Sequence, residues 1–167
     1  MAMRFVVFLF AILSVLNMPK VFCDTKAIID KGVVISDLSA AILAGVPNGA
    51  LYVTIQNCEE CTIILYEVKI DPVICNNVEL HDHVERISAS GIPFLEMIKI
   101  PAMEIKPSET LQLKRGNKHI MLMGIDNTAY CREKSLSLTF YFRKVTGEEF
   151  EVSVNLPIAK EDKRCKG

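Results

Sequence analysis

Apolar and polar positions alternate along most of the chain, and this pattern predicts an almost all-β protein. Segments rich in β-branched, aromatic and aliphatic residues recur roughly every 8–14 residues, separated by Pro, Gly, Asn or Asp. Only residues 37–44 have a pattern compatible with a helical turn. Many short strands at this spacing are typical of a single-domain β-sandwich or Greek-key barrel. The predicted strands span residues 32–37, 50–56, 63–70, 78–84, 94–100, 110–113, 119–123, 135–142 and 149–154.

The N-terminal residues have the pattern of a secretory signal peptide. Arg4 supplies a positive charge, residues 5–16 form an uncharged apolar run, and a proline and a lysine follow shortly after it. A run this short fits a signal peptide better than the ~20 apolar residues of a membrane span. An uncleaved anchor is the alternative. The predicted organisation is a signal peptide over residues 1–23, a β-domain over 24–159 and a charged tail over 160–167.

Charge and motifs exclude two classes of function. Nineteen Lys and Arg oppose twenty Asp and Glu, and the pI of about 6.3 lacks the strongly basic character of a general nucleic-acid-binding protein. The sequence contains no G-x-S-x-G, H-E-x-x-H, P-loop or Rossmann glycine motif. We therefore expect neither a nucleic-acid partner nor an enzyme.

The cysteines are interpreted in light of the predicted export, because exported proteins reach oxidising compartments. Removal of residues 1–23 would leave an odd number of cysteines, so they cannot all pair with one another. Cys58 and Cys61 in the sequence Cys-Glu-Glu-Cys are compatible with a redox pair, a soft-metal site or a loop disulfide. A structural bridge from one of them to Cys75 or Cys131 is the preferred interpretation, with the connectivity left open. The remaining cysteines would be Cys58, Cys61, Cys75, Cys131 and Cys165.

Imidazole and thioether side chains gather in one part of the chain. All three histidines, and all the methionines beyond the predicted signal, lie within residues 81–123. These neutral donors suit copper, and soft thioethers favour Cu(I). His119 and Met121 are two residues apart in a predicted strand and so share a face, as do His81 and His83. Two further methionines are expected to pack in the core rather than to bind metal: Met103 and Met123.

The residues around these donors resemble the periplasmic copper chaperones of the PCuAC family. That family carries a His, then a Met, then 21 residues and a His-x-Met; here 21 residues separate Met97 from His119. The sequence HIMLMG begins at His119, and residues 78–81 (VELH) match the region of the family's first His. The likeness spans roughly residues 32–157, including segments 50–57, 100–102, 111–116 and 136–140.

The resemblance implies a cupredoxin-like Greek-key β-barrel or sandwich. It also implies a periplasmic or secreted chaperone that delivers copper to the copper-centre subunit of cytochrome c oxidase, or to another copper carrier. The alternative is a secreted β-sandwich for binding or adhesion without a copper function. The Cu(I) ligands that the resemblance implies, near one end of the barrel, are His81, Met97, His119 and Met121.

The spacing before Met97 departs from the family. Fifteen residues separate His81 from Met97, five more than in the family, and indicate an insertion around residues 85–93. Asp82 also stands where the family often has Met. His83 therefore remains an alternative to His81 as the first ligand.

Overall fold

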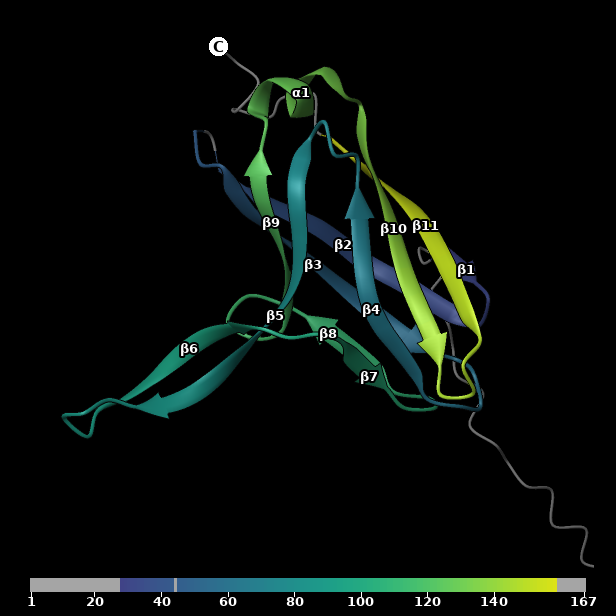
Figure 1. The fold of residues 1–167 in the computed structure, drawn as a ribbon. Coiled ribbons are helices and arrows are strands. Elements are labelled where there is room, and N and C mark those ends of the chain that lie inside the picture. The colour runs from purple at the N-terminus through teal and green to yellow at the C-terminus, as the bar shows by residue number, and fades with distance from the viewer. Residues whose placement is uncertain (1–27, 44, 159–167) are drawn as a thin grey trace, which may run out of the picture.

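The computed structural model describes residues 28–43 and 45–158 (Figure 1). The signal peptide predicted over residues 1–23 and the tail predicted over residues 160–167 lie outside this range. Within it the chain forms eleven strands and one short helix. The elements are β1 (Ile28–Asp30), β2 (Val33–Ile42), β3 (Asn48–Asn57), β4 (Ile63–Ile70), β5 (Cys75–Ile87), β6 (Pro93–Lys99), β7 (Met103–Ile105), β8 (Thr110–Leu113), β9 (His119–Ile125), α1 (Asn127–Arg132), β10 (Ser135–Lys144) and β11 (Glu149–Pro157).

The strands form two antiparallel sheets. The larger sheet has the order β1-β2-β3-β9-β5-β6, and β8 also pairs with β3. The smaller sheet has the order β11-β10-β4-β7. The predicted all-β sandwich is therefore confirmed, and each of the nine predicted strands overlaps an observed one.

Alternation along the strands builds the core. In β3 every second residue from Gly49 to Asn57 is buried, and in β10 the buried residues are Leu136, Leu138, Phe140 and Phe142. Apolar side chains from both sheets form one continuous buried cluster. Because successive strand residues point to opposite sides, the residues between these positions face outward.

The helical turn that the sequence allows at residues 37–44 is wrong. Strand β2 continues through Asp37 to Ile42 and pairs with β3. Asp37 has φ 52° and interrupts the pairing register between Ser36 and Ser39, as a β-bulge does. The bulge breaks the period-2 alternation, so the sequence pattern here does not look like a strand.

The sequence also missed three short elements. Helix α1 follows β9, and Asp126 caps it by accepting hydrogen bonds from the backbone N–H groups of Thr128 and Ala129 at 2.8 and 3.0 Å. The other two are the three-residue strands β1 and β7. Elements of three to six residues are too short to show a period, so pairing and capping define them.

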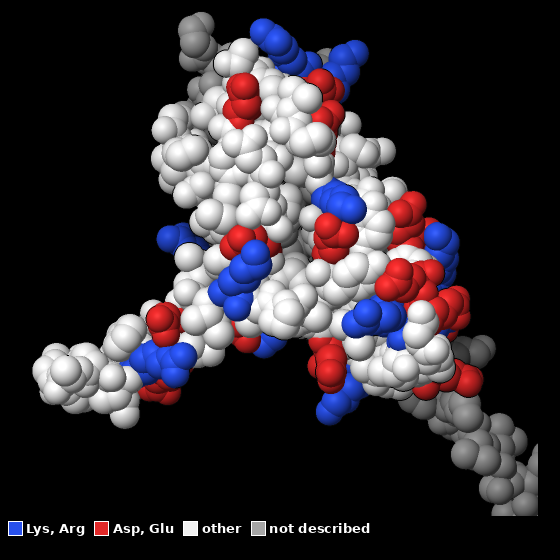
Figure 2. Space-filling view, in the orientation of Figure 1, with Lys and Arg blue, Asp and Glu red and all other residues white. Residues whose placement is uncertain are grey.

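Strands β5 and β6 form a hairpin that projects from the body of the molecule (Figure 1). We call residues 83–97 the arm. Its outer part, residues 87–95, has no charged residue, and Figure 2 shows this end uncoloured, with charged side chains nearer the body. One of these charged groups is the ion pair between Arg86 and Glu96, at 2.9 Å. The residues around 85–93, where the sequence indicates an insertion, lie in this hairpin.

No helix among the described residues is long and apolar enough to cross a membrane.

Candidate metal centre

Strand order brings the predicted donors onto one surface. Strand β9 lies between β3 and β5, and β6 lies on the other side of β5. On β9 the core-facing residues are Ile120 and Leu122, so His119 and Met121 lie on the opposite face. That outer face carries all four predicted donors, from three adjacent strands: His81, Met97, His119 and Met121.

Three imidazole rings lie side by side on this face. His81 is directly opposite His119 in the pairing of β5 with β9, and their ring centroids are 5.8 Å apart. His83 lies two residues further along β5, and its centroid is 5.3 Å from that of His119. Met97 is directly opposite His83 in the arm. His119 is thus the central ring of the three.

One backbone carbonyl orients two of these rings. The Nδ1 atoms of His83 and His119 lie 3.1 and 2.9 Å from the carbonyl oxygen of Asn117. A carbonyl oxygen only accepts hydrogen bonds, so Nδ1 is the donor in both rings. In a neutral imidazole the proton on Nδ1 leaves a lone pair on Nε2. A hydrogen bond from one ring nitrogen to a backbone carbonyl is the usual support of a metal-binding histidine.

His81 is held differently, by a carboxylate. Its Nε2 lies 3.0 Å from Oε2 of Glu79, and the Nζ of Lys99 lies 2.8 Å from Oε1. The hydrogen bond from Lys99, followed by that from His81, lowers the pKa of Glu79 to about 2. Glu79 is therefore ionised at neutral pH and accepts from His81. The Nδ1 of His81 is buried and has no hydrogen-bond partner.

A shallow hollow of about 310 Å³ opens beside the rings. His83, His119 and Met97 contribute to its wall, whereas His81 and Met121 do not. Its other lining residues include Arg115 and no acidic side chain among those described. The hollow therefore combines two imidazoles and one thioether with a positive neighbour.

The loop that carries Asn117 is tied to β5. Nζ of Lys118 lies 2.5 Å from Oδ2 of Asp82, and the backbone N–H of His83 donates to Oδ1 of Asp82 at 2.8 Å. Burial raises the pKa of Asp82, but these hydrogen bonds and the charge of Lys118 outweigh it, so the pKa is lowered. Asp82, in the position where the PCuAC family often has Met, thus connects the two segments that hold the imidazoles.

No group of three or more His, Cys, Asp or Glu side chains in the described part of the chain is arranged to hold a metal ion by itself. A centre on this face with three or more side-chain ligands would therefore include a thioether. Met103 is not available for this, because it is buried in the core, as the sequence predicts. The prediction that Met123 packs in the core is wrong: Leu122 faces the core, so its neighbour Met123 lies half-buried on the outer face, opposite Asn77.

The sequence indicates His83 only as an alternative ligand and contains no signal for the groups that support the rings. The i, i+2 spacing of His81 and His83 shows that both share a face, but not which ring meets the hollow. The roles of Asn117 and Glu79 depend on contacts between strands, for which the sequence contains no signal.

The predicted structural bridge does not involve Cys61 or Cys75. Cys61 and Cys75 are free thiols, so neither is bridged to the other or to Cys58. Cys131 is disulfide-bonded. Its partner is neither Cys61 nor Cys75, because both of these are free thiols. Burial raises the pKa of the Cys75 thiol, which lies 3.2 Å from the carbonyl oxygen of Asn77. Cys75 is therefore a packed thiol rather than a metal ligand.

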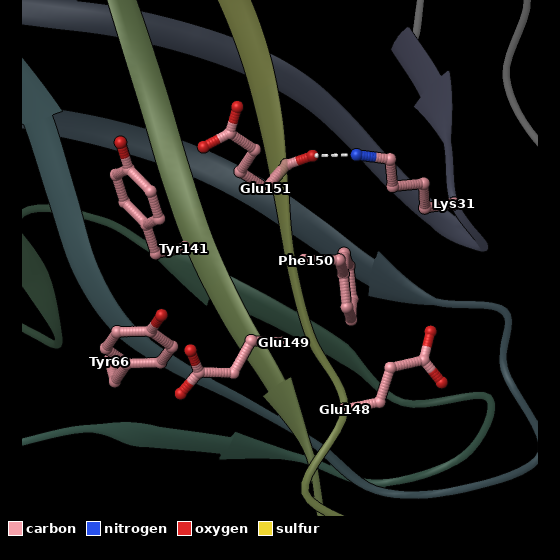
Figure 3. A pocket seen from close by; sticks show the side chains of 7 residues that line it. All are labelled: Lys31, Tyr66, Tyr141, Glu148, Glu149, Phe150 and Glu151. Carbon is pink, nitrogen blue, oxygen red and sulfur yellow. Dashed lines mark hydrogen bonds between the residues drawn. The ribbon is translucent and has the colours of Figure 1, made fainter.

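A larger hollow, of about 550 Å³, lies on the smaller sheet (Figure 3). Glutamates, Tyr66 and Tyr141 line it, and the chain's own cations already cover both rings. Nζ of Lys69 is 4.6 Å from the Tyr141 ring centroid, and the guanidinium of Arg143 is 5.7 Å from that of Tyr66. Its lining contains no His, Cys or Met among the described residues, so it lacks the soft donors of the imidazole face.

Comparison with known proteins gives one family. The model of the LpqE-like lipoprotein family matches residues 33–156, which is most of the chain. No curated protein sequence matches.

Solved PCuAC domains have a similar fold. A copper-bound PCuAC domain from PmoF2 is 17% identical, with a TM-score of 0.55 over 79% of this chain and 96% of that domain. Apo PCuAC domains from PmoF2 and PmoF1 are each 16% identical, with TM-scores of 0.54. They cover 81% and 80% of this chain, and 95% and 98% of their own lengths. The expected cupredoxin-like β-sandwich is therefore confirmed.

Proposed function

Because the chain belongs to the LpqE-like family and has the fold of PCuAC domains, we propose that it is an exported copper carrier without catalytic activity. It binds Cu(I) on the outer face of β9, β5 and β6 and passes the ion to a copper protein. The observation that carries the proposal is the row of imidazoles beside thioethers, with ring nitrogens already oriented. The proposed ligands are drawn from His81 or its alternative His83, together with Met97, His119 and Met121.

The donor set favours a monovalent soft cation. Imidazole and thioether are neutral, so they do not offset a second positive charge. The carboxylate that contacts His81, Glu79, is already paired with Lys99, and Arg115 lines the hollow. A hard divalent cation such as Ca²⁺ or Mg²⁺ needs several oxygen ligands, whereas the described lining of the hollow contains no carboxylate.

Partial exposure suits transfer of the ion rather than permanent storage. His119 is buried, whereas Met97 is exposed at the base of the arm. An incoming protein can replace the Met97 thioether first while His119 still holds the ion. Ligand exchange of this kind releases copper without a free ion in solution.

Two observations support export. The apolar run over residues 5–16 has the length of a signal peptide, and the LpqE-like family is named for lipoproteins. We propose residues 1–23 as the signal and residues 24–159 as the copper-binding domain. The proposed acceptor is the copper-centre subunit of cytochrome c oxidase or another copper carrier.

The test is anaerobic Cu(I) titration of the full chain against a chromophoric chelator. We expect one tight equivalent in the wild type, and its loss in His119→Ala and Met121→Ala. Thermal unfolding of the metal-free variants shows whether the fold is intact. Asn155→Ala, an exposed change on β11, is the matched control.

Two results would contradict the proposal. If both variants still bind one equivalent of Cu(I), the ion is held by other residues, and Cys58 and Cys61 would be tested next. Absence of binding in the wild type would favour a secreted β-sandwich whose exposed arm contacts another molecule.

A further inference from the structure

The register of the arm decides which histidine meets Met97. In the pairing of β5 with β6, Met97 is opposite His83 and Lys99 is opposite His81. Residues directly opposite in an antiparallel pair have Cβ atoms about 4.5–5.5 Å apart. This register therefore places the thioether of Met97 beside His83, and Lys99 beside His81.

The two histidines also differ in what their second nitrogen can reach. His83 lines the hollow, and the Asn117 carbonyl leaves its Nε2 with a lone pair. His81 does not line the hollow, and its remaining nitrogen, Nδ1, has no contact with solvent. An ion entering the hollow meets His83 without any rearrangement of β5.

His83 and His119 form a matched pair. Both donate from Nδ1 to the same acceptor, the Asn117 carbonyl oxygen, at 3.1 and 2.9 Å. Their centroids are 5.3 Å apart, closer than those of His81 and His119. One carbonyl thus orients two imidazoles that line the same hollow, and Met97 adds a thioether sulfur to their two nitrogens.

We infer that His83 binds the copper ion together with His119 and Met97, at the hollow beside the arm. The inference rests on the proposed function, since it concerns which residues hold the same ion. His81 is held by Glu79, which Lys99 pairs in turn, and its ring centroid lies 5.8 Å from that of His119. The insertion in the β5–β6 hairpin has thereby changed the composition of the site.

The test compares His83→Ala with wild type in Cu(I) titration of the full chain. We expect the affinity to fall by more than about tenfold, because loss of even a supporting group costs that much at a metal site. X-ray absorption at the copper edge should show one fewer imidazole in the variant. His83→Met, which restores a soft donor, should recover most of the affinity. Glu85→Ala, on the same strand and face but at an exposed position, is the matched control and should bind as wild type.

The outcomes separate this inference from the proposed function. If His119→Ala loses the ion while His83→Ala binds as wild type, the inference is wrong and the proposed function stands. A wild type that binds no Cu(I) overturns both. If His83→Ala does not fold, judged by far-ultraviolet circular dichroism, His83→Gln replaces it. An unchanged imidazole count and affinity in that variant would also refute the inference.

Discussion

Glu79 is the side chain that couples the imidazole face to pH. It accepts hydrogen bonds from Lys99, His81 and Asn77 at 2.8, 3.0 and 2.9 Å. The first two lower its pKa from 4.5 to about 2. A carboxylate with a lowered pKa in the folded state stabilises the protein above its unfolded pKa, and that contribution is lost as pH falls toward the folded pKa.

We predict that Glu79→Gln flattens the acid dependence of stability. Wild type should lose stability between pH 5 and pH 2, and the variant should lose about 1–2 kcal/mol less, a figure reduced for solvent screening. Urea unfolding at a series of pH values measures this. Glu85→Gln, exposed on the same strand, is the control. If the free energy of unfolding depends on pH in the same way for wild type and Glu79→Gln, the contacts of Glu79 do not stabilise its charge.

The arm is the element that most distinguishes this chain from a compact sandwich. Ile87 and Leu95 are 75% and 62% exposed, so their side chains contribute little to the core. An isolated two-stranded hairpin is at best marginally stable in water. Its base is held by the pairing of β5 with β9, whose inward residues Leu80 and Ile120 are buried.

We therefore predict that residues in the outer part of the arm can be substituted without loss of global stability. The double substitution Ile87→Thr and Leu95→Thr should alter the free energy of unfolding by less than about 0.5 kcal/mol, since surface changes have small effects. Leu122→Ala, in the core of β9, should cost about 2–5 kcal/mol. Chemical denaturation gives the free energy of unfolding of wild type, the double variant and Leu122→Ala. If the double variant loses as much stability as Leu122→Ala, the outer part of the arm packs against the body of the molecule.

At the scale of the whole molecule, Asn57 joins the two sheets. It is fully buried at the end of β3 in the larger sheet, and its Nδ2 donates to the carbonyl of Ile105 in β7 of the smaller sheet at 2.9 Å. The same nitrogen donates to the carbonyl of Cys61, and Oδ1 accepts from the backbone N–H of Glu59, each at 2.9 Å. One amide thus fixes both the edge of the sandwich and the Cys-Glu-Glu-Cys loop.

We predict that Asn57→Ala lowers the free energy of unfolding by about 2–4 kcal/mol, because one buried and two part-buried hydrogen bonds lose their side-chain partner. Differential scanning calorimetry and urea unfolding should agree on the loss. Asn155→Ala on exposed β11 should stay near wild type. Equal stability of the two variants would show that water replaces the amide at Asn57.

Much of the fold follows from local pattern. Strands such as β4 and β8 have the predicted bounds, because alternation of apolar and polar residues is a property of each segment alone. The bulge at Asp37 and the three-residue strands could not be predicted in this way, since they arise from pairing with a neighbour.

The sequence by itself determined that the protein is built of strands, that its soft donors lie within residues 81–123, and that His119 shares a face with Met121. These properties depend on residue type and on the two-residue period of a strand. Only the tertiary structure decided that Met97 meets His83, and that the Asn117 carbonyl orients two rings. Those contacts depend on strand order and register between segments distant in sequence. Pairing across the sheet sets both, so no single segment encodes them.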